Sequence, residues 1–179
     1  MLATYAGRVV VPKAEQRARM RSWRRGLTET DLAARSGRVA HHVAPLLQGH
    51  RAVMGFRAVR GEPVLDTVWN AVSNAGGDMV WATADDDPTE VSLGGVTAVV
   101  MPALAVTSAG DRLGQGGGWY DRLLQRCAPG VRTIAVCFDE QVVDALDVEA
   151  HDMTVDIIVT DVRVIEPPPP TRRGHEPVS

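Results

Sequence analysis

The sequence has little cysteine and no long apolar run, and both absences exclude classes of protein. Only Cys127 and Cys137 occur among 179 residues, and they do not form a C-x-x-C pair. We expect reduced, buried thiols, one in a helix and one in a strand. No apolar run is long enough to cross a bilayer, and the first residues lack the apolar region of a signal peptide. We therefore expect a cytoplasmic protein with no membrane partner.

The chain also lacks a large net charge. Its formal net charge of −3 opposes general attraction to nucleic acid. A content of 45% hydrophobic and 23% charged residues is typical of a globular protein. The length suffices for one domain with a substantial core, expected over residues 1–164. The remaining residues, 165–179, contain Pro167–Pro170 followed by mixed charges, and are expected to form a disordered tail.

Apolar periodicity predicts helices that alternate with short strands. Helices are expected at 12–26, after a capping box at 28–31, from Pro63 to Gly76, at 120–127 and at 140–146. Strands are expected at 52–56, 79–83, 96–101, 133–138 and 155–160. Because these strands are apolar nearly throughout, we predict an α/β fold whose mainly parallel sheet is covered on both faces. Ligands bind such sheets beyond the carboxyl ends of the strands.

Residues 107–123, TSAGDRLGQGGGWYDRL, form the most informative segment. Glycines crowd a turn between an apolar run and a predicted helix. They let backbone N–H groups approach a ligand closely, and the helix N-terminus adds partial positive charge. Arg112 supplies a cation before the turn, and Asp121 supplies a carboxylate that suits Mg²⁺. The combination predicts a phosphate site in a protein that uses a nucleotide.

Two common phosphate-binding motifs are absent from this turn. No G-K-[ST] follows the glycines, so the turn is not a P-loop, and Trp119 stands where G-x-G-x-x-G requires its last glycine. The alternative is a flexible glycine loop in which Asp121 is a simple helix N-cap. That alternative explains Arg112 and the strand–glycine–helix order less well.

The segment Arg112–Arg122 resembles the R-L-G-x-G-x-G-x-Y-D signature of 5-formyltetrahydrofolate cyclo-ligases, also called methenyltetrahydrofolate synthetases. Other segments resemble the family in the same order. These are Lys13–Arg17 (K-x-x-x-R), Gly61–Pro63 (an acidic turn), Val99–Ala105 (a strand and V-P-G-x-A-F) and His151–Met153 (H-D). The likeness covers about residues 12–161, which is more than one short motif.

The resemblance implies a three-layer Rossmann-like sandwich of the NagB/RpiA/CoA-transferase type. It also implies a ligase of one-carbon metabolism that uses ATP and Mg²⁺ to convert 5-formyltetrahydrofolate to 5,10-methenyltetrahydrofolate, with release of ADP and phosphate. In this reaction the formyl oxygen attacks the γ-phosphoryl group, and ring closure then expels phosphate. The protein is expected to contribute alignment and charge neutralisation, as a monomer or weak dimer.

The resemblance also assigns roles to individual residues. Catalytic roles are expected for Arg112, Lys13 and Arg17. These three are also expected to bind ATP, together with Leu113, Gly114, Gln115, Gly116, Gly117, Gly118, Trp119 and Tyr120. The reduced folate is expected to contact Glu62, Arg57 and the segment Gln115–Trp119. Asp121 and Asp152 are expected to hold Mg²⁺.

Each of these roles has a simpler alternative. The residues Lys13, Arg17, Arg21 and Arg24 could form a solvated basic face. Glu62 could merely favour the N-terminus of the following helix. Asp152 could be an ordinary loop acid, with Asp156 as a competing metal ligand. Trp119 and Tyr120 could simply pack the helix against the sheet.

The middle of the chain is shorter than in typical family members. Only residues 84–95 separate two predicted strands, without the Pro-Arg pair, hairpin and Glu-Pro dipeptide that help to wall the family's folate pocket. Arg57 stands where many members have tyrosine or an apolar residue. An ATP-binding protein that has lost or changed the folate reaction is therefore the alternative function. A nucleic-acid binder using the basic residues of 13–25 is a third hypothesis, which the net charge opposes.

Overall fold

A six-stranded sheet forms the centre of the protein in the computed structural model, which describes residues 3–5, 8–59, 61–81, 86–149 and 152–168. The strand order is β10-β9-β8-β5-β3-β4. The bounds are β3 (Ala52–Gly55), β4 (Asp78–Trp81), β5 (Ala98–Pro102), β8 (Arg132–Val136), β9 (Ile157–Val159) and β10 (Val164–Ile165). All neighbouring strands of this sheet pair in parallel except β10 with β9. The predicted mainly parallel sheet is confirmed.

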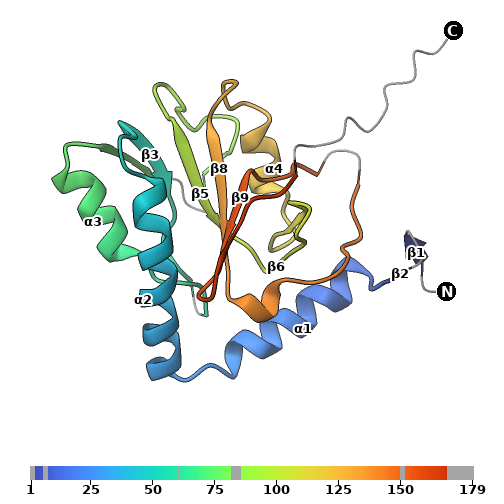
Figure 1. Ribbon diagram of the computed structural model, residues 1–179. Helices are drawn as coiled ribbons and strands as arrows, with labels where there is room; N and C mark the ends of the chain where they lie inside the picture. The colour runs from blue at the N-terminus through green and yellow to red at the C-terminus, as the bar shows by residue number, and fades with distance from the viewer. Residues whose placement is uncertain (1–2, 6–7, 60, 82–85, 150–151, 169–179) are drawn as a thin grey trace, which may run out of the picture.

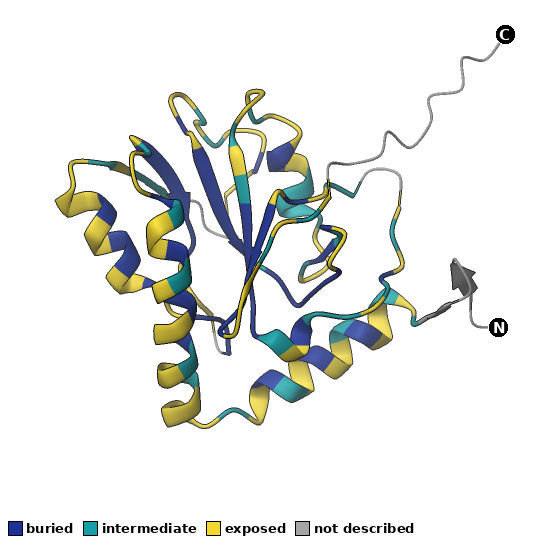
Figure 2. Ribbon diagram, viewed as in Figure 1, coloured by how far each residue is buried: buried dark blue, intermediate teal, exposed yellow. Residues whose placement is uncertain are grey.

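Helices cover both faces of this sheet and make three layers (Figure 1). Helices α2 (Glu29–Leu46) and α3 (Asp66–Asn74) pack on one face, through a core cluster that includes Val39 and Trp69. Helix α4 (Trp119–Leu124) packs on the other face through Leu123 and Leu124. Figure 2 shows mostly buried strands between helices whose outer faces are exposed. The α/β sandwich follows from strands that are apolar on both faces.

Helix α1 (Lys13–Arg25) lies across the carboxyl ends of the parallel strands, beside the 3-10 helix η1 (Asp139–Gln141) that follows β8 (Figure 1). Its Met20 packs with Leu104, Ala105 and Leu113. These contacts join α1 to a small antiparallel ribbon of β6 (Ala105–Val106) and β7 (Arg112–Leu113). The helix is thereby placed next to the glycine-rich segment.

Most predicted elements are found with bounds shifted by one to three residues, and two predicted helices have a specific reason for the difference. One of the two hydrogen bonds of the predicted capping box is present at the start of α2: Thr28 Oγ1 accepts from Asp31 N at 3.1 Å. The third helix begins at Asp66 rather than Pro63, since Val64 N–H donates to Ser36 Oγ at 3.0 Å. The predicted helix at 140–146 is limited to η1. Beyond η1, Val143 N–H donates to Val106 O at 2.8 Å, so the chain runs along β6 instead.

Three pairings were not predicted from the sequence. They are the hairpin of β1 (Ala3–Tyr5) with β2 (Arg8–Val10), the β6–β7 ribbon, and β10 beside β9. Strand β10 extends to Ile165, one residue into the predicted tail. Residues 169–179 of that tail lie outside the described part of the chain.

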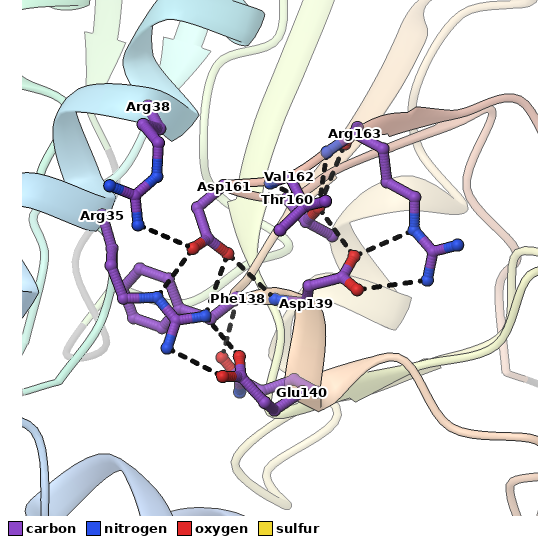
Figure 3. A network of polar contacts seen from close by, with 10 residues as sticks. Arg35, Arg38, Phe138, Asp139, Glu140, Thr160, Asp161, Val162 and Arg163 are labelled. Atoms are coloured by element: carbon purple, nitrogen blue, oxygen red, sulfur yellow. Dashed lines mark hydrogen bonds and ion pairs between the residues drawn. The ribbon is translucent and has the colours of Figure 1, made fainter.

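A network of charged side chains joins α2 to the ends of β8 and β9 (Figure 3). Asp161 accepts from Arg35 Nε at 2.7 Å, from Arg38 Nη2 at 3.3 Å and from Asp139 N at 3.0 Å. Burial alone would raise the pKa of Asp161, but the hydrogen bonds from Arg35 and the backbone outweigh burial and lower it. The network ties one helical layer to the carboxyl edge of the sheet.

Both cysteines are free thiols, and each lies just beyond the helix or strand in which the sequence placed it. Cys127 is half-buried in the turn after α4, and Cys137 is buried directly after β8. Burial raises the pKa of the Cys137 thiol to about 12, which keeps it neutral. None of the helices in the described residues is long and apolar enough to cross a membrane.

Candidate active site

The glycine turn connects β7 to α4 at the carboxyl edge of the sheet. Gly116 has φ +117° and Gly118 has φ +61°, values in the left-handed region that favours glycine. Gly118 is also the residue that precedes the first turn of α4. The predicted strand–glycine–helix order is confirmed, although the β6–β7 ribbon lies between the long strand β5 and the turn.

Helix α1 holds the glycine turn through two of its arginines. Arg17 Nε donates to Gly114 O at 3.0 Å. Arg21 donates to Gln115 O at 2.7 Å and to Gln115 Oε1 at 3.1 Å. Residues four apart on a helix share one face, which explains why both arginines reach the same loop. The alternative of a purely solvated basic face is wrong.

Lys13 begins the same helix and forms ion pairs with a loop near the C-terminus. Its Nζ lies 2.9 Å from Asp152 Oδ2 and 3.4 Å from Glu149 Oε2. Burial would lower the pKa of Lys13, but its hydrogen bond and ion pair with Asp152 outweigh burial, and the net effect raises the pKa. Lys13 is therefore a stable cation beside Asp152. The Asp152 carboxylate is also held by Glu149 N–H at 2.8 Å.

Arg112 and Asp121 face each other across the turn. Arg112 Nη2 lies 3.3 Å from Asp121 Oδ1, and the arginine side chain is only 2% exposed. Its guanidinium carbon is 5.4 Å from the centre of the Tyr120 ring. Arg112 Nε has no hydrogen-bond partner among the described residues. A buried cation with an unused N–H group is suited to an incoming anion.

Asp121 is the third residue of α4, so it is not the helix N-cap. That place belongs to Gly118, and the N-cap alternative is wrong. Asp121 Oδ1 also accepts from Met153 N at 3.3 Å. This contact brings the segment of Asp152 next to Asp121, as the proposed metal pair requires.

The residues of this region enclose a cavity of about 320 Å³. Pockets of this order bind small molecules. The lining residues come from the end of β3, the following turn, the end of β5, the glycine turn and α4. They are Phe56, Arg57, Val59, Glu62, Pro102, Ala103, Leu104, Arg112, Gly114, Gln115, Gly117, Gly118, Trp119, Tyr120 and Asp121.

Glu62 is a buried acid on the wall of this cavity. Its Oε2 accepts from Val59 N at 3.2 Å, and its Oε1 lies 3.4 Å from Arg24 Nη1. Burial raises the pKa of Glu62, while the Val59 N–H group and the Arg24 charge act against that rise. Because α3 begins four residues later, Glu62 does not lie in its first turn. The helix-terminus alternative for Glu62 is wrong.

Aromatic side chains form the remainder of the cavity wall. Arg57, at the exposed rim, lies with its guanidinium carbon 3.9 Å from the centre of the Trp81 ring. Trp119 and Tyr120 contact each other edge to face at 4.9 Å and pack against the core while they line the cavity. Trp119 Nε1 also donates to Asp86 O at 2.8 Å, so the short central segment docks on the site.

The donor set that the sequence indicates for Mg²⁺ consists of Asp121 and Asp152. Among the described residues, no three His, Cys, Asp or Glu side chains gather where they could hold a metal. Two carboxylates nevertheless fit Mg²⁺ that takes its other ligands from phosphate and water. Asp156 does not belong to this set, because its Oδ2 accepts from Thr133 N and Oγ1 at the amino ends of β8 and β9. His151 lies outside the described residues.

Other predicted residues lie beside the cavity rather than on its wall. Arg17 contacts the backbone of Gly114, which lines the cavity, and Lys13 pairs with Asp152 beside it. The side chain of Leu113 packs in the core. Sequence reasoning missed the apolar wall of Phe56, Val59, Pro102, Ala103 and Leu104. Their position near the carboxyl ends of β3 and β5 is the signal that could have found several of them. Sequence reasoning also assigned no role in the site to Arg24, which contacts Glu62.

The sequence model of the 5-formyltetrahydrofolate cyclo-ligase family matches residues 73–161 of this chain. A curated 5-formyltetrahydrofolate cyclo-ligase from Mycolicibacterium smegmatis is 38% identical over 74 residues, which is 41% of this chain and 38% of the relative. The mouse enzyme of the same name is 37% identical over 73 residues, covering 38% of this chain and 36% of the relative. The matched stretch thus spans under two-fifths of these curated relatives.

Solved structures share the fold over a longer part of the chain. A 5,10-methenyltetrahydrofolate synthetase from Mycoplasma pneumoniae superposes with a TM-score of 0.72 at 16% identity, covering 84% of this chain and 99% of that one. The synthetase from Aquifex aeolicus gives a TM-score of 0.75 at 22% identity, covering 92% and 97%. The three-layer fold is shared with both. Residues 73–161 of this chain are thus similar in sequence to 5-formyltetrahydrofolate cyclo-ligases, as the resemblance in the sequence indicates.

Proposed function

We propose that this protein is an ATP- and Mg²⁺-dependent 5-formyltetrahydrofolate cyclo-ligase. One observation carries the proposal: Arg112, the glycine turn and Glu62 open into a single cavity. A phosphate site and an acceptor for ring N–H groups are then close enough for both substrates to meet. The enzyme is proposed to act in the cytoplasm as a monomer or weak dimer, without a nucleic-acid or membrane partner.

The nucleotide half of the site is built from cations and glycine backbone. Lys13, Arg17 and Arg112 would neutralise the triphosphate, and the turn from Leu113 to Tyr120 would let it approach the backbone. Lys13 and Arg112 each pair with an acid that would hold the metal, Asp152 and Asp121 respectively. Mg²⁺ bound there with ATP would neutralise further phosphate charge.

In this reaction the folate supplies both nucleophiles, so the protein contributes alignment of the substrates and neutralisation of charge. The formyl oxygen of the folate attacks the γ-phosphorus, and the bond from that phosphorus to the ADP oxygen breaks. The second folate nitrogen then attacks the formyl carbon, closes the ring and releases its proton to water, and the phosphorylated oxygen leaves as phosphate. Arg112 is buried next to Asp121 and can stabilise charge on the transferred group without rearranging.

The folate half of the site would use the opposite wall. Glu62 presents carboxylate oxygens to the amino and ring N–H groups of the pterin. Gln115 and Trp119 line the same cavity. Arg57 at the rim supplies a cation that suits the carboxylates of a folate. The docking of Asp86 on Trp119 supports a closed wall despite the short central segment.

Turnover with the purified protein tests this proposal. Incubation with ATP, Mg²⁺ and 5-formyltetrahydrofolate should produce the near-UV absorbance of the methenyl product. Arg112→Ala and Asp121→Ala should each lower the rate on the order of a thousandfold, because neutralisation of the phosphoryl group is lost. Arg132→Ala, on an exposed residue at the amino end of β8, is the matched control and should retain the rate. A flat trace with normal ATP binding would reject the proposal.

The shortened segment favours one second candidate, an ATP-binding protein that has lost or changed the folate reaction. Only residues 82–97 separate β4 from β5. Calorimetry that shows binding of ATP but not of any reduced folate would support this candidate. The nucleic-acid hypothesis has less support, because Lys13, Arg17 and Arg24 contact protein groups at the site.

A further inference from the structure

Arg24 is a buried arginine that stands behind the cavity wall. It lies near the end of α1 and is only 4% exposed. Its Nη1 lies 3.4 Å from Glu62 Oε1, and its Nη2 donates to Ala103 O at 2.5 Å. Glu62 and Ala103 both line the cavity, whereas Arg24 does not. The arginine therefore touches the wall from the protein side and not the ligand.

Packing alone does not require an arginine at this place. Position 24 follows the buried Met20 by one helical turn, so it lies on the apolar side of α1. A buried ion pair is often no more stabilising than apolar residues of similar volume. Arg24 Nε also has no hydrogen-bond partner among the described residues. An arginine that is incompletely paired in a buried position calls for a role beyond packing.

Among the residues that the structure describes, the other groups in contact with Glu62 carry no positive charge. Val59 contributes a backbone N–H, and the Gln115 side chain from the glycine turn hydrogen-bonds the same carboxylate. Burial raises the pKa of Tyr120 on α4, so its phenol is neutral. Cys137 near Arg24 is a neutral thiol, and Arg112 is paired with Asp121. Arg24 is thus the positive charge that favours the ionised form of Glu62, alongside the hydrogen bonds from Val59 and Gln115.

We propose that Arg24 is a positioning residue that keeps Glu62 ionised and aimed into the cavity, where it accepts hydrogen bonds from adjacent N–H groups of a ligand ring. An ionised carboxylate only accepts, whereas a protonated one also donates and would face the ligand N–H groups with the wrong polarity. In this chain the inference rests on the proposed function, since the pterin of a reduced folate is such a ring.

Binding of 5-formyltetrahydrofolate to paired variants tests the inference. Arg24→Met should weaken folate binding by about thirtyfold, whereas Arg24→Lys should recover part of the affinity. The loss should be larger at about pH 6 than at about pH 9, because Glu62 without Arg24 is more readily protonated. ATP affinity, measured on the same samples, should stay unchanged. Arg25→Met, on the exposed neighbour, is the control.

A double-mutant cycle separates positioning from structure. If Arg24 acts through Glu62, Arg24→Met should have no further effect on folate affinity in a Glu62→Gln protein. An equal loss in both backgrounds, or a parallel loss of ATP affinity, would overturn the inference. The double variant Arg24→Met, Glu62→Gln removes both buried charges and can fold even if Arg24→Met alone does not. Its folate affinity can then still be compared with that of Glu62→Gln.

A titration without folate separates this inference from the proposed function. NMR of ¹³C-labelled glutamate, assigned with Glu62→Gln, should show a higher titration midpoint for Glu62 in Arg24→Met than in wild type. An unchanged midpoint would overturn the inference whether or not folate binds. Failure of wild type to bind folate, together with a shifted midpoint, would reject the proposed function and leave the Arg24–Glu62 relation standing.

Discussion

At the scale of single residues, the glycines of the turn are not equivalent. Gly116 has φ +117°, and a Cβ added there would meet only ordinary contacts with Arg17 at 3.6 Å. Gly117 has neither a positive φ nor any atom within 4 Å of an added Cβ. The need for glycine at position 116 is therefore one of backbone conformation, not of space.

This difference predicts that Gly116→Ala lowers the free energy of unfolding by about 1–2 kcal/mol, because an L-residue is strained at that φ. Gly117→Ala should change it by less than about 0.5 kcal/mol. Urea unfolding of the two variants beside wild type measures both values. Equal losses would show that the turn does not hold the conformation described here.

Sequence reasoning identified some site residues and could not separate others. Arg112, Asp121 and Glu62 occur in recognisable patterns, and the structure brings all three to one cavity. Arg24 shares its spacing with Lys13, Arg17 and Arg21, and periodicity alone cannot say which member is buried. That depends on where the turn of Glu62 packs, a contact between residues 38 positions apart.

At the scale of elements, α1 was predicted almost to its bounds, but its place was not. A helical period indicates which residues share a face and says nothing about the surface that the face meets. Here the basic side of α1 meets the carbonyl groups of the glycine turn. The predicted helix at 140–146 failed for a related reason, since pairing of residue 143 with β6 outweighs local preference.

The placement of α1 predicts unequal effects of its arginines on nucleotide binding. Arg17→Met should weaken ATP binding on the order of tenfold, because a charge-assisted contact at the phosphate site is lost. Arg19→Met, on an exposed residue of the same helix, should leave ATP affinity unchanged. Calorimetric titration with ATP compares them. Similar affinities for the two variants would mean that Arg17 only holds the loop.

At the scale of the whole molecule, the network around Asp161 connects the layers. Its carboxylate is 2% exposed and pairs with Arg35 and Arg38 on α2. Asp161→Asn should lower the free energy of unfolding by about 2–3 kcal/mol at neutral pH, since the amide replaces a buried carboxylate that pairs with the partly buried Arg35. Glu140→Gln is the control, because the Glu140 side chain is 51% exposed in its pair with Arg35 and its loss should cost under about 1 kcal/mol.

The same network predicts a pH dependence with a definite sign. The pKa of Asp161 is lower in the folded protein than its ordinary value, so its stabilisation is complete above the unfolded pKa of about 3.9. It is lost as the pH falls through the lower folded value. The difference in unfolding free energy between wild type and Asp161→Asn should therefore stay constant from pH 7 to about pH 5 and shrink as the pH falls below about 4. A constant difference would contradict this origin.

The layered sheet could be predicted because its strands are apolar on both faces, as Val99 and Ile134 illustrate. The polar connections between layers could not. Asp161 lies 126 positions from Arg35, and nothing in either neighbourhood marks the pair. Short strands such as β6 and β10, with two residues each, are likewise defined by their partners rather than by their own sequence.

Helix α1 touches the phosphate side of the cavity with Arg17 and the opposite wall with Arg24. These residues are seven positions apart, about 10 Å along a rigid helix. Any shift of the helix that follows occupation of one side is transmitted to the other without an intervening hinge. Occupation of the two sides should then be coupled, each changing the affinity at the other by the same factor.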